Sequence, residues 1–160
     1  LIVPQLAYHD VVNTTLLGSN LWFSNKLLED AGEYVQGAIL TTGFFPESED
    51  PAVRDFVTRF EAIYGRPPGF IEAIAYDAAR VMLTTVLHPD AWLRAGIRHR
   101  LLTLENKAAL TGRVRFEGNG DSLQALPLLQ IRENGFRQLD ANRPPDWKPW
   151  QVAVPPAPEP

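Results

Sequence analysis

The segment TTLLGSNLWFSNKLLEDAGEYVQGAILTT, residues 14–42, decides the fold class of this chain. Residues 14–18 are β-branched or apolar and stop at a glycine, which predicts a short buried strand. Asn25 to Val35 carries apolar residues at helical spacing and predicts a helix. Residues 37–42 are again apolar and predict a second strand. A strand, a helix and a strand in this order indicate an α/β or α+β domain.

Three further helices are predicted beyond this segment. Asp50 is a good N-cap, Pro51 suits the first helical position, and Gly65 ends that helix. The next helix runs from about Phe70 to Leu87, and apolar residues lie on more than one of its sides, so we expect it to be buried on more than one side. Asp90 is expected to cap a third helix to about Glu105. The stripes expected to face inward are Ile71, Ile74, Ala75, Ala78, Val81, Met82 and Thr85 in the second helix, and Leu93, Ile97, Leu101 and Leu104 in the third.

The period changes to two after Thr111-Gly112, which indicates strands. Strands are predicted at Val114–Phe116, Leu126–Arg132 and Phe136–Leu139. A turn at Glu117–Asp121 and a second turn at Asn134-Gly135 would join them into an antiparallel β-meander. Residues 142–160 hold seven of the 14 prolines and predict an extended tail. The chain therefore divides into a domain at 1–141 and a Pro-rich tail at 142–160.

Composition excludes several classes of protein. The 160 residues are 45% hydrophobic, enough for one ordinary core, and the net charge of −4 provides no basic footprint for nucleic acid. There is no cysteine, which excludes disulfides and thiol nucleophiles. The chain begins at Leu1 inside an apolar pattern and without Met, so we expect further polypeptide to precede it.

No pattern of catalytic or metal-binding residues stands out. His9, His88 and His99 have no His or Glu partner at helical spacing, which disfavours a metal pair. The Glu117–Asp121 segment has the alternate spacing of a calcium loop, but Leu128 stands where such a loop needs a bidentate Glu, so a turn is expected there. No nucleophile elbow or phosphate loop occurs. We therefore expect no cofactor, no metal and no enzyme activity.

Asp77 lies inside an apolar helix pattern, and a buried carboxylate needs a partner. Arg80, three residues on, is one candidate, and a nearby backbone N–H is another. Either partner makes Asp77 a structural residue.

Polar and aromatic side chains follow the first predicted strand. Ser19, Asn20, Trp22 and Phe23 come directly after Gly18, and ligands of α/β proteins bind beyond the carboxyl ends of strands. An amide and an aromatic ring suit a small solute that is partly polar and partly apolar. Alternatively, Trp22 packs over the edge of the sheet, as most large aromatic residues serve burial.

Several short motifs, taken in order, resemble the type I periplasmic-binding proteins, the branched-chain amino-acid receptors of ABC transporters. The resemblance covers residues ~1–140. Its motifs are Gly18-Ser19-Asn20-Leu21-Trp22, Tyr34-Val35-Gln36-Gly37-Ala38, Gly43-Phe44-Phe45, Tyr64-Gly65-Arg66-Pro67-Pro68, Ala75-Tyr76-Asp77-Ala78-Ala79, Leu110-Thr111-Gly112-Arg113-Val114-Arg115-Phe116 and Gly118-Asn119-Gly120-Asp121.

The resemblance implies a later portion of a two-lobed α/β fold, with a parallel sheet flanked by helices plus the C-terminal antiparallel β-meander. Three crossing strands join the lobes of such proteins, and residues 37–42 would lead into one crossing. Such proteins hold their ligand between the lobes, and the ligand is an amino acid, an amide or a related small solute. Closure of the two lobes signals that the ligand is bound. Ser19 to Phe23 aligns with the ligand loop of the second lobe, where Asn20 and Trp22 stand in place of the acidic residue of some members.

The resemblance also implies an extracytoplasmic location, periplasmic or anchored at the outer membrane, and an ABC permease as partner. A second interpretation is a scaffold or regulatory lipoprotein of the same fold, similar to activators of penicillin-binding proteins, which binds a protein instead. Because only part of the fold is present, the chain could also pair with a copy of itself to cover exposed apolar surface.

Overall fold

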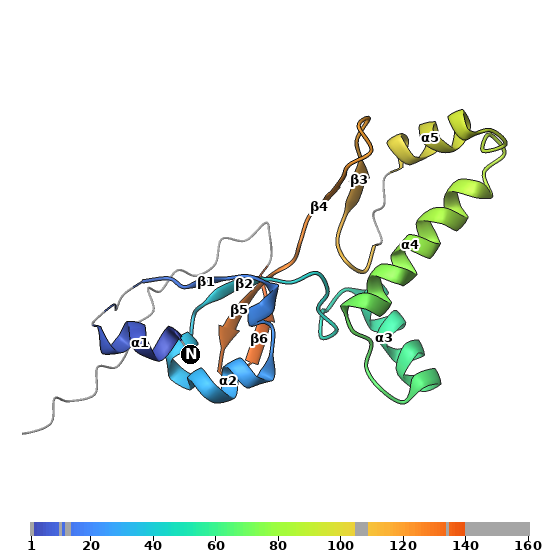
Figure 1. Ribbon diagram of the computed structural model, residues 1–160. Coiled ribbons are helices and arrows are strands. Elements are labelled where there is room, and N and C mark those ends of the chain that lie inside the picture. Colours follow the sequence, from blue (N-terminus) through green and yellow to red (C-terminus); the bar gives the residue numbers. More distant parts are fainter. Residues whose placement is uncertain (1, 10, 12–13, 105–108, 134, 140–160) are drawn as a thin grey trace, which may run out of the picture. The chain divides into compact units, whose positions relative to one another are not determined.

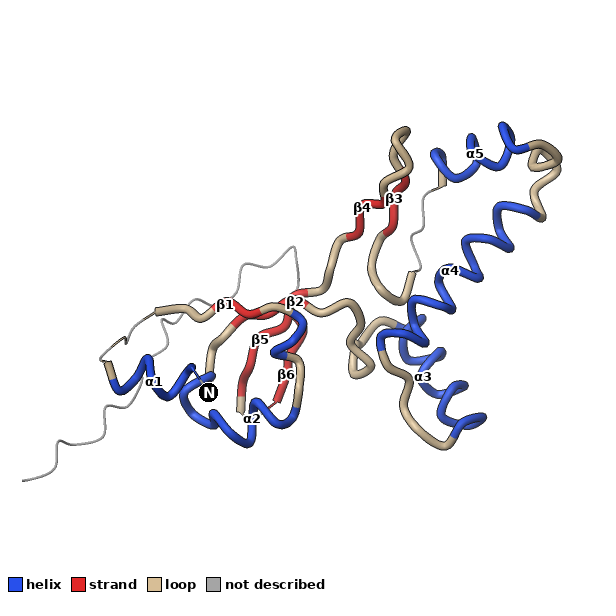
Figure 2. Tube along the Cα trace, in the orientation of Figure 1, coloured by secondary structure: helices blue, strands red, loops and turns tan. Residues whose placement is uncertain are grey.

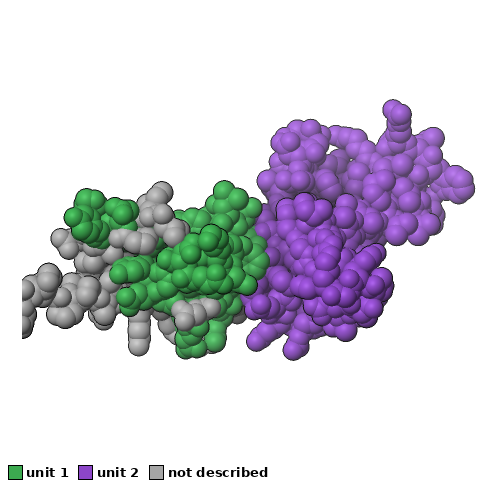
Figure 3. All heavy atoms as spheres, turned by 60° about the horizontal axis from the view of Figure 1, so that its bottom comes forward, with its two compact units in different colours: residues 1–42, 128–160 green, residues 43–127 purple. Residues whose placement is uncertain are grey.

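The computed structural model describes residues 2–9, 11, 14–104, 109–133 and 135–139. The predicted tail at 142–160 lies outside the described residues. The chain divides into two compact units (Figure 3). Unit 1 comprises residues 1–42 and 128–160, and unit 2 comprises residues 43–127. Unit 2 is thus inserted into unit 1, and the chain passes between the units at 42–43 and at 127–128.

Unit 1 is built on a four-stranded sheet of order β1-β2-β5-β6 (Figures 1 and 2). The strands are β1 (Leu17–Gly18), β2 (Ile39–Thr41), β5 (Leu128–Arg132) and β6 (Gly135–Gln138). Its helical elements are α1 (Ile2–Tyr8), η1 (Asn20–Trp22), α2 (Asn25–Ala31) and η2 (Gly32–Val35). The strand–helix–strand prediction for residues 14–42 is confirmed, and the helix changes to a 3-10 turn at Gly32, where φ is +49°.

The sheet of unit 1 is mixed, because it joins the expected parallel pair to two strands of the expected antiparallel meander. Strands β1 and β2 pair in parallel, β5 pairs antiparallel with β2, and β6 pairs antiparallel with β5. Buried apolar residues of β2, η2 and β5 form the core: Val35, Leu40, Leu129 and Ile131. The first strand is not buried as predicted: Leu17 is 74% exposed, and β1 lies at the edge of the sheet.

The described residues of unit 2 form three helices and a two-stranded sheet (Figure 1). The helices are α3 (Pro51–Tyr64), α4 (Phe70–Val86) and α5 (Arg94–Thr103), and the strands are β3 (Val114–Phe116) and β4 (Ser122–Gln124). The caps of α3 are those predicted. An Asp50 carboxylate oxygen accepts a hydrogen bond from the Ala52 N–H at 2.8 Å, and Gly65 ends the helix in the left-handed conformation. The core cluster of this unit consists of Phe44, Val53, Phe56, Ala73 and Leu110.

Three details of unit 2 differ from the sequence prediction. Asp90 does not cap α5, because residues 89–92 form a turn and the helix begins at Arg94, which leaves Leu93 exposed. The predicted meander is split, because β3 pairs with β4, a strand the sequence did not predict, while β5 and β6 join unit 1. Most of the stripe of α4 predicted to face inward is exposed. Thr85 is its one buried member, and the helix packs through Thr85 together with Ala73 and Asp77, which lie off that stripe.

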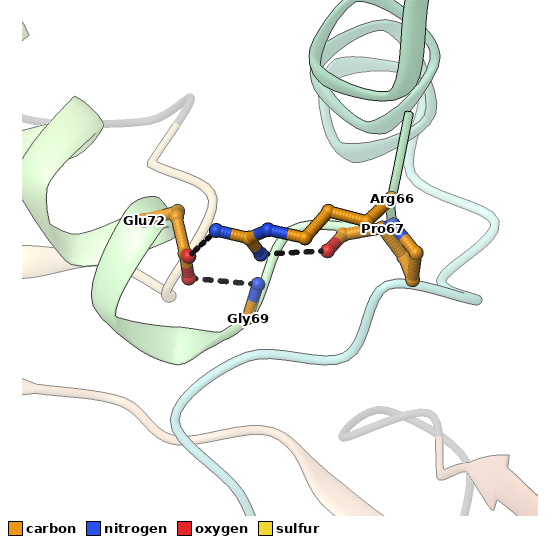
Figure 4. Close-up of polar contacts among 4 residues, drawn as sticks. All are labelled: Arg66, Pro67, Gly69 and Glu72. Atoms are coloured by element: carbon orange, nitrogen blue, oxygen red, sulfur yellow. Dashed lines mark hydrogen bonds and ion pairs between the residues drawn. The ribbon is translucent and has the colours of Figure 1, made fainter. Parts of the chain in front are cut away.

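A polar clamp orders the loop between α3 and α4 (Figure 4). One Glu72 carboxylate oxygen accepts a hydrogen bond from Arg66 at 2.6 Å, and the other accepts from the Gly69 N–H at 2.9 Å. Arg66 also donates to the Pro67 carbonyl at 3.2 Å, and its guanidinium lies 5.3 Å from the centre of the Phe60 ring. The hydrogen bond from Arg66, followed by backbone N–H donors, lowers the pKa of Glu72 below its ordinary value of 4.5.

Asp77 joins α4 to the segment that precedes β3. Its carboxylate is buried and accepts hydrogen bonds from the Leu110 N–H at 3.0 Å, the Thr111 N–H at 2.9 Å and the Thr111 hydroxyl at 2.8 Å. The sequence left either Arg80 or a backbone N–H group as the partner of Asp77, and the structure shows that backbone N–H groups bind its carboxylate. These hydrogen bonds connect positions 33 and 34 residues apart in the sequence.

We expect Asp77→Ala to destabilise the protein by about 3 kcal/mol, because two buried backbone N–H groups lose a charged acceptor. Urea unfolding followed by circular dichroism measures this loss. Asp55→Ala is the matched control, since Asp55 is an exposed helical residue whose carboxylate pairs with Arg59 across one turn of α3. Equal stability of the two variants would contradict the assigned role of Asp77.

The Glu72 clamp should stabilise the fold in a pH-dependent way. A carboxyl whose pKa is lower in the folded state than in the unfolded state stabilises the fold above its unfolded pKa, and this contribution is lost as the pH falls through the folded pKa. We expect Glu72→Gln to be less stable than the wild type at pH 6 and this difference to shrink as the pH is lowered below 4.5. Urea unfolding at both ends of this range measures it, with Glu61→Gln as the control. A difference that does not change with pH would show that the charge of Glu72 is not what matters.

Candidate functional site

The predicted ligand residues form a short turn at the carboxyl end of β1. Ser19 caps η1, and its hydroxyl oxygen accepts a hydrogen bond from the Leu21 N–H at 3.4 Å. The Trp22 N–H donates to the Ser19 carbonyl at 3.0 Å, and the Phe23 N–H donates to the Asn20 carbonyl at 3.1 Å. The four predicted residues are therefore consecutive members of one ordered turn, together with Leu21.

The members of this turn differ in their exposure. Ser19 and Asn20 are exposed, and Leu21 is 84% exposed. Trp22 and Phe23 are half-buried. The turn thus offers a hydroxyl, a carboxamide and an apolar side chain to solvent, beside two aromatic rings. The sequence analysis did not single out Leu21, although its place inside the turn is a sufficient signal.

The two aromatic rings pack against the sheet of unit 1. A methyl group built onto Gly18 would lie 2.5 Å from the indole carbon Cδ2 of Trp22, so the ring lies directly on the glycine backbone. The Phe23 ring meets the Phe136 ring of β6 edge to face, with 4.8 Å between their centres. The packing role foreseen for Trp22 is therefore present, and the residue remains partly exposed.

The two passages of the chain between the units leave the sheet side by side. Thr41 pairs with Leu128 in the antiparallel register of β2 and β5, and both stand next to a passage. Residues 37–42 thus lead to the unit boundary, the place where the sequence analysis expected a crossing between lobes.

Phe70, an aromatic residue that the sequence did not predict to be functional, packs against Gly43, the first residue of unit 2. The Phe70 ring, at the start of α4, covers Gly43, where no side chain could be added without displacing the ring. Phe70 is 43% exposed. The glycine directly after a predicted strand was the signal that something approaches the backbone closely there.

The described residues hold neither a metal cluster nor a membrane-spanning helix. They contain no group of three or more His, Cys, Asp or Glu residues that could hold a metal ion. Among them, no helix is both long enough and apolar enough to span a bilayer. A shallow depression runs along residues 29–36 beside α2 and η2, but none of the four predicted site residues lines it.

Solved structures similar to this chain come from solute-binding components of ABC transporters. A Rhodospirillum rubrum protein assigned to branched-chain amino acid ABC transport is 30% identical, with a TM-score of 0.75 over 86% of this chain and 41% of that chain. A substrate-binding protein from Desulfitobacterium hafniense, solved in complex with Leu, is 26% identical, with a TM-score of 0.57 over 83% of this chain and 38% of that chain. A leucine-binding protein from Thermotoga maritima is 21% identical, with a TM-score of 0.57 over 86% of this chain and 41% of that chain, and shows the shared fold.

These comparisons also define how much of the fold is present. The chain spans about two fifths of the length of these relatives. No curated protein sequence matches it. The sequence model of the periplasmic binding proteins matches residues 2–135, which is most of the chain. This chain therefore belongs to the periplasmic binding protein family, as its motifs and its α/β fold indicated.

Proposed function

We propose that this chain is part of an extracytoplasmic receptor that binds an amino acid, an amide or a related small polar solute for an ABC transporter. The ligand would contact Ser19, Asn20, Trp22 and Phe23, and the two units would close around it. The observation that carries the proposal is the ordered turn after β1, which presents polar groups beside two half-buried rings.

The chemistry of the turn suits a ligand with a polar end and an apolar part. The Asn20 carboxamide has both donors and acceptors, so it can meet a carboxylate, an amide or an ammonium group. The Ser19 hydroxyl can donate to a ligand while its oxygen accepts the Leu21 N–H. Trp22 supplies apolar contact area whose position is fixed by Gly18. The relative from D. hafniense was solved with Leu, which supports this class of ligand.

The connection between the units supports a closing motion. Both passages leave neighbouring positions of one sheet, at Thr41 and Leu128. Changes in a few backbone dihedral angles there can reorient one unit without disturbing either core, as in hinge closure. A ligand drives closure only if it binds the closed state better than the open state.

One observation favours the alternative, a scaffold or regulatory lipoprotein that binds a protein. Helix α4 exposes a continuous apolar face, including Ile71 and Met82. Exposed apolar patches of this kind mark interaction surfaces. Solute binding that depends on Trp22 separates the two functions, because a pure scaffold has no need of it.

Thermal unfolding with a panel of amino acids and small amides tests the receptor. A solute present at a hundredfold excess over its Kd should stabilise the chain by about 2.7 kcal/mol. We expect Trp22→Ala to abolish this effect, and Trp92→Ala to preserve it, because Trp92 is 89% exposed and lies in unit 2. Unchanged solute affinity of Trp22→Ala would refute the assignment of the site.

Gly18→Ala tests whether the position of the indole ring matters. The added methyl group would clash with Trp22 and push the ring off the strand, while Trp22 itself is retained. We expect solute affinity to fall by about tenfold or more, since a ring displaced by an ångström loses its aligned contacts. Gly118→Ala is the control, because nothing lies within 4 Å of a methyl group added there. Equal affinities in both variants would mean that Trp22 serves packing alone.

A further inference from the structure

The connection between α4 and α5 exposes large apolar side chains. Residues 87–93 form turns and bends between the two helices, and Figure 1 shows the chain turning back here at the C-terminal end of α4. Trp92 is 89% exposed, Leu87 is 77% exposed and Leu93 is 74% exposed. Scattered single apolar residues on a surface need no explanation, but several large ones in one short connection mark an interaction surface.

Helix α5, which begins directly after this connection, is basic. It carries Arg94, Arg98 and Arg100 and no acidic residue, although the whole chain has a net charge of −4. Arg94 and Arg98 are four positions apart, so they share one face of the helix, and both are exposed. Within the described residues, no carboxylate forms an ion pair with either of them. The apolar connection is therefore followed by two positive charges that no acidic side chain neutralises there.

The side chain of Arg98 is held in place by its own unit. Its guanidinium donates a hydrogen bond to the Gly118 carbonyl, in the turn between β3 and β4, at 2.8 Å. A carbonyl group carries no net charge, so this bond orients the guanidinium and leaves its positive charge uncompensated. The basic face of α5 is thus an ordered feature of unit 2.

The chemistry of these side chains indicates an anionic bilayer as the partner. Indole rings and leucine side chains favour the boundary between lipid head groups and acyl chains. Arginines near an anionic membrane surface are attracted to its head groups, and their long stems keep the charge at that surface while apolar neighbours enter more deeply. Connections between helices run over the surface of a protein, and a bilayer accepts exposed rings and leucines without a matching pocket.

We propose that residues 87–98 form a membrane-docking surface for an anionic lipid bilayer. Leu87, Trp92 and Leu93 enter the head-group region, and Arg94 and Arg98 bind the lipid phosphates. The contact is peripheral and reversible, because it combines a few apolar side chains with a few charges. The surface lies in unit 2 and the proposed solute site lies in unit 1, so the proposal goes beyond the proposed function and does not rest on it.

Co-sedimentation of the 160-residue chain with lipid vesicles tests this surface. One set of vesicles consists of phosphatidylcholine alone, and the other contains phosphatidylglycerol as well, each at low and at high salt. Arg94→Glu and Trp92→Ala alter the docking surface. Arg54→Glu and Ile63→Ala are the matched controls, because both residues are exposed on α3. Circular dichroism checks that every variant is folded, and sedimentation velocity without lipid gives the oligomeric state.

We expect the chain to bind the anionic vesicles, and this binding to weaken at high salt because the charges are screened. Arg94→Glu should lower the partition coefficient about fivefold or more, since it removes one arginine from the anionic surface and adds a repelled carboxylate. Trp92→Ala should lower it about tenfold, because a large apolar side chain no longer leaves water. Both controls should bind as the wild type does.

A fluorophore reports which residues enter the lipid. The chain has no cysteine of its own, so an environment-sensitive dye can be attached at Leu93→Cys alone or at the control Ile63→Cys alone. We expect the dye at position 93 to shift to shorter wavelengths on anionic vesicles, and the dye at position 63 to keep its emission in water.

Four results would overturn the proposal. A folded chain that does not bind anionic vesicles would show that this surface has no affinity for lipid. Equal binding by Arg94→Glu, Trp92→Ala and the controls would assign the lipid contact to another part of the chain. Equal binding to phosphatidylcholine alone, at either salt concentration, would show that head-group charge plays no part. A dimer without lipid that Arg94→Glu dissociates would assign the surface to a second copy of this chain.

Discussion

The pairing of β2 with β5 is the constraint on which the rest of the structure depends. It joins Ile39–Thr41 to Leu128–Gln130 in an antiparallel register, although unit 2 lies between them in the sequence. The Gln130 side chain reinforces it with a hydrogen bond to the Gly37 carbonyl, a contact across 93 residues. Because this pairing fixes both passages between the units, it closes unit 1 and anchors the two ends of unit 2 together. Bringing the two ends of unit 2 together costs loop-closure entropy, and the backbone hydrogen bonds between β2 and β5 offset this cost.

Unit 2 depends on a second long-range contact of a different kind. Asp77 holds the segment before β3 against α4 through buried hydrogen bonds to Leu110 and Thr111. Such a contact fixes orientation, since a carboxylate must meet its donors at defined angles, whereas apolar packing tolerates sliding. The aromatic cluster around Phe56 supplies the burial, and Asp77 fixes which face of α4 turns inward. This explains why the helix buries Ala73 and leaves the more hydrophobic Ile71 outside.

What the sequence predicted well is local. The Asp50-Pro51 start and the Gly65 end of α3 depend on groups within one turn, as does the turn at Glu117–Asp121 between β3 and β4. The errors concern contacts between distant residues. An apolar stripe on α4 does not by itself show which side of the helix faces the core. The sequence of the strands after Gly112 likewise does not show that β5 joins a different sheet from β4. For the candidate site, the sequence predicted the residues of the turn and left the role of Trp22 open, because its contact with Gly18 depends on backbone geometry.

The contact of Trp22 with Gly18 allows one residue to serve both packing and the proposed binding of solute. An indole ring that lies on a glycine has little freedom to turn, so its other surface is presented to solvent in a fixed orientation. A ligand that stacks there would not have to order the ring, and binding would avoid that entropic cost. The packing of Trp22 and its proposed contact with solute are therefore compatible, because the first prepares the second. The same reasoning does not extend to Leu21, which is exposed on the same turn and lacks any such support.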